Sequence, residues 1–281
     1  MLKHPYLFID LDGTLLTKNQ TISKYNLEAL DKYTKANGTV VLSTGRSLAN
    51  TLKVVSLIKN KINYQIQYIS CFNGALIYDC INHKVLSAKL IDSEILTKLF
   101  DFTKTNNLGF WPYNQTYIDE MTIQLFNISY AWLIKLYYTS HIVIKPKQYD
   151  PINDKVYKVN ILPNALYKKL NSSIYQQLKE LCNNQATVSY TSKHIIEITP
   201  QKTDKGEAMK FIAKLLNTSL DQIACIGDSS NDIPMFKIAN LSAAAKLKRI
   251  HIKDYVDLII NKKKHKDSVG IFINQYLLNN H

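Results

Sequence analysis

The sequence YLFIDLDGTL at residues 6–15 gives the first indication of how this chain folds. Its first four residues are typical of strands, so a short buried strand is predicted to end at Asp10. Gly13 then allows the backbone to turn sharply. Two carboxylates at the end of a buried strand, Asp10 and Asp12, are costly unless a partner offsets their charge, and oxygen ligands suit Mg²⁺. The sequence therefore predicts a metal site here.

The composition limits the class of protein. The chain has 281 residues, of which 46% are hydrophobic and 20% are charged, which fits one large or two moderate folded domains. It contains no run of about 18 apolar residues and no basic-then-apolar signal pattern, so we expect no membrane span and a cytoplasmic location. The cysteines form no C-x-x-C pair, which favours reduced thiols over metal or disulfide roles; they are Cys71, Cys80, Cys182 and Cys225.

The net charge of +13 raises the question of a nucleic-acid partner. The lysines are spread along the chain, and only residues 262–266 form a tight basic run. No aromatic interleaving of the RNA-module type and no recognisable DNA-binding motif accompanies them. We interpret the charge as a solvated lysine surface and expect no nucleic-acid partner, although the positive field can help attract phosphorylated substrates.

Short apolar strands alternate with helices in both terminal parts of the chain. The expected strands cover residues 6–10, 39–43, 67–71, 222–226 and 256–260, and the expected helices cover 23–35, 48–59, 205–216 and 268–278. This alternation predicts an α/β fold with a parallel sheet covered on both faces. The middle differs, with helices expected at 92–105 and 165–182 and strands at 158–162, 187–190 and 195–199. We therefore expect a core from residues 1–81 and 200–281, interrupted by an α+β insertion over residues 82–199.

Four segments share one pattern, an apolar strand followed by polar residues at its C-terminal end. They cover residues 9–14, 42–46, 70–74 and 225–232. Because ligands bind outside the C-terminal ends of the strands in an open parallel sheet, these segments are predicted to meet in one crevice. Only eight glycines occur, and five adjoin polar residues of the predicted site; these are Gly13, Gly45, Gly74, Gly206 and Gly227.

With these motifs in this order, the chain resembles the haloacid dehalogenase superfamily of phosphatases, specifically the Cof-type branch with a large C2-type cap. DLDGTL at 10–15 matches the first motif, Thr44 within STGR at 43–46 the second, Lys205 within DKGEA at 204–208 the third, and GDSSND at 227–232 the fourth. The resemblance covers nearly the whole chain and implies a Rossmann-like, doubly wound parallel core with an inserted α+β cap domain. Ser229 departs from it, since many relatives carry glycine there.

The resemblance also implies a Mg²⁺-dependent phosphatase that acts on small phosphorylated metabolites, sugar phosphates or phosphorylated cofactors, through an aspartyl phosphate. Asp10 is then the nucleophile and a metal ligand, and Asp12 is the general acid and later base, reaching the metal through its backbone carbonyl. Asp228 is the third protein ligand, and Asp232 orients Lys205 or metal-bound waters. The residues expected to bind phosphate or substrate are Thr44, Gly45, Arg46, Asn73, Lys205 and Asn231.

Each of these residues also has a purely structural interpretation. Asp10 and Asp12 could cap a strand end, Thr44 could cap a helix, and Asp228 and Asp232 could cap the helix starting near Asn231. Lys205 could lie on a helix surface, and Asn73 could belong to a turn. Arg46 could pair with a carboxylate instead of substrate. Aromatic residues of the insertion and one histidine could line a substrate pocket or belong to the core; they are Trp111, Tyr113, Tyr117, Trp132, Tyr137, Tyr138 and His194.

Two other functions stay open at this point. A phosphomutase on the same scaffold would return the phosphoryl group to a sugar instead of to water. A basic nucleic-acid-binding or regulatory protein would show salt-sensitive binding and no metal-dependent turnover. The sequence leaves the physiological substrate and the oligomeric state undetermined.

Overall fold

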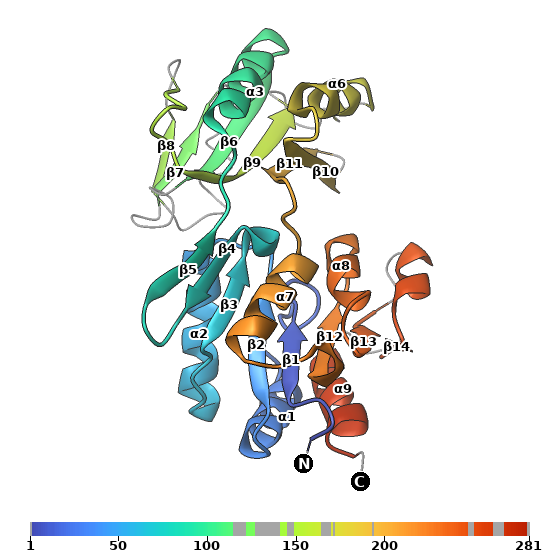
Figure 1. Ribbon diagram of the computed structural model, residues 1–281. Helices are drawn as coiled ribbons and strands as arrows, with labels where there is room; N and C mark the ends of the chain where they lie inside the picture. The colour runs from blue at the N-terminus through green and yellow to red at the C-terminus, as the bar shows by residue number, and fades with distance from the viewer. Residues whose placement is uncertain are drawn as a thin grey trace. The chain divides into compact units, whose positions relative to one another are not determined.

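The computed structural model describes residues 2–114, 122–126, 141–144, 149–163, 170, 172–192, 194–246, 250–260 and 267–279. The chain forms two compact units, Met1–Ser87 with Asp204–His281 and Ala88–Thr203 (Figure 1). The boundaries fall a few residues after the expected ones at 81 and 199. The reason at the first boundary is that β5 (Lys84–Ala88) still belongs to the sheet of the first unit.

The first unit is built on an eight-stranded sheet in the order β14-β13-β12-β1-β2-β3-β4-β5. The strands besides β5 are β1 (Tyr6–Ile9), β2 (Thr39–Ser43), β3 (Tyr68–Cys71), β4 (Leu76–Asp79), β12 (Ile223–Gly227), β13 (Leu241–Ala244) and β14 (Leu258–Ile259). The helices are α1 (Lys24–Lys35), α2 (Leu48–Ile62), α7 (Lys205–Leu215), α8 (Ile233–Phe236) and α9 (Ser268–Phe272), the last continued by a π-helical turn over Ile273–Leu277.

The sheet is parallel from β14 to β3 and turns antiparallel at β4. The α/β class and the parallel core are as predicted. The β4–β5 extension and β13 were not predicted. β4 is only four residues long and follows β3 after a single 3-10 turn, and β13 reads LSAA, with no β-branched residue. Neither therefore gives the long β-branched run that indicates a strand.

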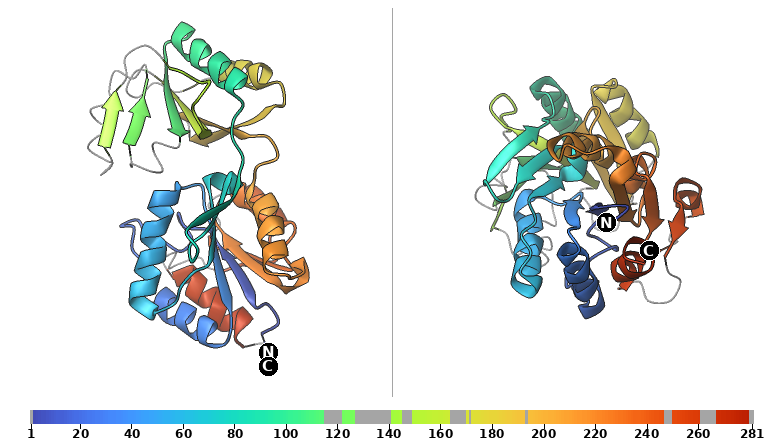
Figure 2. Two further views of the ribbon diagram at one scale, coloured as in Figure 1. Left: turned by 60° about the vertical axis from the view of Figure 1, so that its left-hand side comes forward. Right: turned by 60° about the horizontal axis from the view of Figure 1, so that its bottom comes forward.

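β1 lies at the centre of the sheet between β12 and β2, and both of its faces are covered. Phe8 packs on the side of α7 and α8, together with Met209 and Met235. Leu7 and Ile9 point to the opposite face and are fully buried. Figure 2 shows α1, α2 and α9 on one side of the sheet and α7 on the other. A strand buried on both faces explains the unbroken apolar run before Asp10.

The second unit holds a four-stranded antiparallel sheet in the order β10-β11-β9-β6. Its strands are β6 (Leu108–Asn114), β9 (Val156–Pro163), β10 (Ala186–Ser192) and β11 (Ile195–Pro200), and β7 (Thr122–Leu125) pairs in parallel with β8 (His141–Ile144). Helices α3 (Ser93–Thr105) and α6 (Ser172–Cys182) cover one face of the sheet (Figures 1 and 2). Phe100, Phe110 and Ile198 belong to the core between them.

Several sequence predictions fall partly or wholly outside the described residues. They are the first part of the helix expected at 165–182, the basic run 262–266, and the aromatic residues Tyr117, Trp132, Tyr137 and Tyr138. None of the helices in the described ranges combines the length and the apolar character that a membrane crossing requires.

Candidate active site

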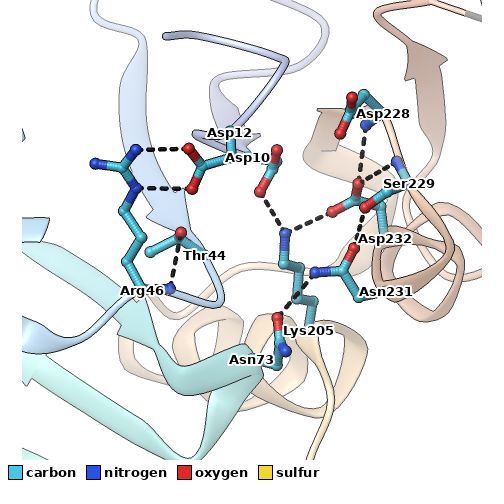
Figure 3. A network of polar contacts seen from close by, with 10 residues as sticks. All are labelled: Asp10, Asp12, Thr44, Arg46, Asn73, Lys205, Asp228, Ser229, Asn231 and Asp232. Atoms are coloured by element: carbon cyan, nitrogen blue, oxygen red, sulfur yellow. Dashed lines mark hydrogen bonds and ion pairs between the residues drawn. The ribbon is translucent and has the colours of Figure 1, made fainter. Parts of the chain in front are cut away.

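Polar residues gather at the C-terminal ends of the central parallel strands. Asp10 follows β1 and its backbone N–H donates to the carbonyl of Ile226 at 3.0 Å. Thr44 follows β2 and its N–H donates to the carbonyl of Ser70 at 2.9 Å. Asp228 follows β12 directly. The strand pairing thus continues one residue beyond β1 and β2, which fixes where Asp10 and Thr44 begin to point outward (Figure 3).

Lys205 is the centre of the polar network. It is the first residue of α7, its side chain is fully buried, and its Nζ donates to Asp10 Oδ1 and to Asp232 Oδ1 at 2.6 Å each. Asp204 caps the helix by accepting from the N–H of Glu207 at 2.8 Å. The alternative of an exposed helix residue is therefore wrong for Lys205, because a buried ammonium needs anionic partners and here has two.

Asp232 links Lys205 to the loop after β12. Its Oδ2 accepts the backbone N–H groups of Asp228 and Ser229, both at 2.9 Å, while its Oδ1 accepts from Lys205. The first contacts include one half of a capping box with Ser229, so a capping role is present together with the lysine contact. One carboxylate thereby holds both the loop and the ammonium in fixed positions.

Three buried carboxylates lie close enough to share a cation. One oxygen from each of Asp10, Asp228 and Asp232 lies within 4.8 Å of the others. Burial raises the pKa of Asp10 to about 7; the ammonium of Lys205 opposes this shift, and the negative charges of Asp232 and Asp228 add to it. Hard oxygen donors and surplus negative charge in a buried place are what Mg²⁺ requires of its ligands, so the donor set fits that ion.

The carboxylate of Asp12 is not in this group and instead pairs with Arg46. Arg46 Nε donates to Asp12 Oδ2 at 2.7 Å and Nη2 donates to Oδ1 at 2.5 Å, in a two-pronged pair. The Asp12 side chain is 58% exposed. Arg46 also donates to Gln20. Of the two alternatives for Arg46, the structure contains the carboxylate pair.

Thr44 and Asn73 complete the rim of the network on the β2–β3 side. Thr44 Oγ1 accepts from the N–H of Arg46 at 3.2 Å, and the N-cap of α2 is Ser47, so Thr44 is not the helix cap. Asn73 has a left-handed backbone with φ of 55° and its Oδ1 accepts from Asn231 Nδ2 at 2.9 Å. A Cβ on Gly45 would lie 3.0 Å from the same Oδ1, so Gly45 makes room for this turn.

Sequence reasoning missed Lys246. This buried lysine follows β13, and its Nζ donates to Gly13 O and contacts Asp228 Oδ2, both at 2.9 Å. The signal was available, because an apolar segment ending in a polar residue is the pattern that identified the other four segments. The small residues of β13 concealed it.

The described aromatic candidates of the second unit belong to its sheet. Trp111 and Tyr113 are buried, and their rings stack with centroids 5.0 Å apart. Lys158 Nζ lies 4.6 Å from the centre of the Tyr113 ring. His194 is exposed. Trp111, Tyr113 and Lys158 thus form one aromatic and charged set within the sheet of the second unit.

Comparison with known proteins identifies close similarities over the whole chain. A family model described as haloacid dehalogenase-like hydrolase matches residues 7–273. The chain is 31% identical to a Mycoplasma pneumoniae protein whose name assigns it provisionally to the phosphatases, over 91% of this chain and 98% of the relative. It is 28% identical to the 5-amino-6-(5-phospho-D-ribitylamino)uracil phosphatase of Bacillus subtilis, over 96% of each chain.

Solved structures show the same fold. A haloacid dehalogenase-like hydrolase from Bacteroides thetaiotaomicron superposes with a TM-score of 0.78 at 21% identity, covering 97% of this chain and 99% of that one. A sugar phosphatase of haloacid dehalogenase subclass IIB superposes with a TM-score of 0.72 at 18% identity, covering 90% of this chain and 92% of the other.

Proposed function

The chain belongs to the haloacid dehalogenase-like hydrolase family, in which it is a phosphatase of the Cof type, and we propose that it hydrolyses small phosphorylated metabolites with Mg²⁺ through an aspartyl phosphate. Two relatives support the proposed substrate class, since one is named for a phosphoribityl compound and another as a sugar phosphatase. Both names are those of phosphatases, which favours transfer to water over transfer to a sugar as in a phosphomutase.

The observation that carries the proposal is the buried contact of Lys205 with Asp10 beside two further aspartates. A nucleophilic carboxylate must be ionised, and burial alone would keep Asp10 protonated near neutral pH. Asp10, Asp228 and the backbone carbonyl of Asp12 would hold Mg²⁺, with Asp232 beside them orienting Lys205. The bound ion would supply the charge that ionises Asp10 and neutralises the phosphate. Because the ionisation of Asp10 depends on a bound cation, this carboxylate is suited to attack phosphorus only when Mg²⁺ is bound.

The side chains of this site divide the remaining tasks of phosphoryl transfer. Asp10 forms the bond to phosphorus as the bond to the leaving oxygen breaks, and Lys205 neutralises charge on the transferring group. Asp12 gives the leaving oxygen a proton and later takes one from water, which typically contributes about 10²–10⁴-fold to the rate. The exposed carboxylate of Asp12 is held by Arg46, so this pair must loosen for the proton to move.

The remaining rim residues position the phosphate. Thr44 accepts a hydrogen bond from the Arg46 N–H, and its hydroxyl hydrogen can donate to a phosphate oxygen. The amides of Asn73 and Asn231 hold one another at the edge of the same network. Because phosphoryl transfer leaves the protein little covalent work, such positioning supplies a large part of the catalysis.

The test is the variant Asp10→Asn with p-nitrophenyl phosphate and Mg²⁺. We expect the rate to fall at least about 10³-fold, because an amide cannot attack phosphorus. Asp31→Asn is the matched control, since Asp31 makes an exposed pair with Lys35 on α1. Unchanged turnover in a folded Asp10→Asn protein would refute the nucleophile. A screen of phosphorylated metabolites with and without Mg²⁺, measuring released phosphate, then narrows the substrate.

A further inference from the structure

We propose that Lys246 is a built-in cation of the metal site, whose ammonium shares Asp228 with Mg²⁺ and weakens the binding of that ion. The inference rests on the proposed function and deepens it by naming a residue that sets metal affinity. It concerns a lysine that none of the four sequence motifs contains.

The position of the Lys246 ammonium is tightly defined. Its Nζ lies 2.9 Å from Asp228 Oδ2 and 2.9 Å from the carbonyl oxygen of Gly13, and both side chains of the ion pair are 7% exposed. A buried ammonium is stable only where acceptors replace its lost water, and these two do so. Lys246 is thus tied to the metal-ligand candidate Asp228 and is not a solvated surface charge.

The turn after Asp12 is shaped around this ion pair. Gly13 has a φ of 83°, and a Cβ placed on it would lie 2.3 Å from Asp228 Oδ2 and 2.6 Å from Lys246 Nζ. A side chain at position 13 would therefore collide with both partners. The ammonium consequently joins three elements: the 10–13 turn, the loop after β12 and the end of β13.

The charges explain what this contact does. Among the described residues, the three aspartates of the cluster meet two ammonium groups, Lys205 on Asp10 and Lys246 on Asp228. A carboxylate has two oxygens and can accept from an ammonium while another lone pair binds a metal. A second positive charge on the same carboxylate repels a divalent ion, and in a buried site this repulsion is strong. Lys246 therefore keeps Asp228 in place without metal, at a cost in Mg²⁺ affinity.

The test measures Mg²⁺ binding to the metal-free full-length protein by isothermal titration calorimetry. In Lys246→Met and Lys246→Gln we expect the Kd for Mg²⁺ to fall about tenfold or more, because one nearby positive charge is gone. The glutamine variant keeps a hydrogen-bond donor, which protects the test if the methionine variant does not fold. Lys24→Met, which removes a charge from a side chain that is 91% exposed, should leave the Kd unchanged.

Thermal unfolding gives an independent readout. Without metal, Lys246→Met should melt below the wild type, because Asp228 loses its partner, and Mg²⁺ should raise its Tm by more than it raises that of the wild type. If folded variants bind Mg²⁺ with unchanged or weaker affinity, Lys246 only supports the structure and the inference is overturned. Asp228→Asn distinguishes this inference from the proposed function. If the wild type binds no Mg²⁺, both are refuted. If Asp228→Asn abolishes Mg²⁺ binding but the Lys246 variants leave the Kd unchanged, only this inference is refuted.

Discussion

Lys205 of the first unit and Lys158 of the second are both buried, but they meet carboxylates in different ways. Lys205 in the first unit contacts Asp10 and Asp232 at 2.6 Å, with Asp228 close by. Lys158 in the second unit forms an ion pair with Glu197 at 3.0 Å and lies against the ring of Tyr113. Both lysines are at most 6% exposed. The difference lies in the balance of charge around them.

Burial of a lysine therefore does not by itself indicate a catalytic or metal-binding site. A balanced pair such as Lys158 with Glu197 largely offsets its own desolvation cost. The cluster around Lys205 keeps a surplus of negative charge even with Lys246 included, and that surplus requires a further cation or a proton. Burial raises the pKa of Asp10 to about 7, and the negative charges of Asp232 and Asp228 add to this shift, so a proton can occupy Asp10 where no cation does.

The largest effect is expected when each lysine is replaced in turn. Lys205→Met and Lys158→Met should each lower the free energy of unfolding by about 3–5 kcal/mol, because each leaves buried carboxylates without their cation. Mg²⁺ should restore much of the loss in Lys205→Met, since it supplies charge to the same carboxylates. In Lys158→Met, Mg²⁺ should stabilise no more than it does in the wild type.

Urea unfolding in EDTA and in Mg²⁺ measures both effects. The wild type supplies the ordinary gain from metal binding, against which each variant is compared. If Mg²⁺ stabilises the two variants equally, the carboxylates around Lys205 do not bind the cation in place of the lost lysine.

Much of the first unit followed from its sequence because its signals are local. The apolar run before Asp10 predicted β1, and the rule that ligands bind at the C-terminal ends of parallel strands placed segments more than 200 residues apart at one edge of the sheet. That edge is where the structure brings Asp10, Thr44 and Asp228. The α/β class was therefore predictable from strand patterns and motif order.

What was not predicted is of two kinds: contacts between distant elements, and strands whose local signal is weak. No local pattern says that Arg46 pairs with Asp12, because long side chains choose partners only once the loops are in place. Lys246 escaped notice because β13 lacks β-branched residues. The antiparallel β4 was missed because a single 3-10 turn over Phe72–Gly74, and not a crossover α-helix, separates it from β3. Only the Arg46 pairing depends wholly on tertiary contacts, whereas β13 and β4 give strand signals that are local but weak.

A second prediction uses the proton that Asp10 holds when metal is absent. The folded-state pKa of Asp10 is raised by burial from 3.8 to about 7, so the folded protein binds this proton more tightly than the unfolded chain does. The contribution of Asp10 to stability is therefore present below about pH 4 and is lost as the pH rises through about 7. In EDTA, the wild type should lose at most ~4 kcal/mol relative to Asp10→Asn over this range.

Unfolding curves in EDTA at several pH values, for wild type and Asp10→Asn, measure this loss. Adding Mg²⁺ at pH 8 should return stability to the wild type more than to Asp10→Asn, since the metal favours the ionised carboxylate. Parallel pH profiles for the two proteins would mean that Asp10 does not hold the proton. The surplus charge would then be offset elsewhere in the cluster.

The smallest effect is expected where charge is balanced. Replacing both members of the second-unit pair, as Lys158→Met with Glu197→Leu, should leave the free energy of unfolding within ~1 kcal/mol of the wild type, because no unpaired charge stays buried. Each single variant should cost ~3–5 kcal/mol, so the double-mutant cycle should yield a large coupling energy. If the double variant is as unstable as the single ones, the pair is required for more than mutual neutralisation. The packing around Trp111 and Tyr113 would then depend on the charges of Lys158 and Glu197, just as the aspartate cluster of the first unit depends on a cation.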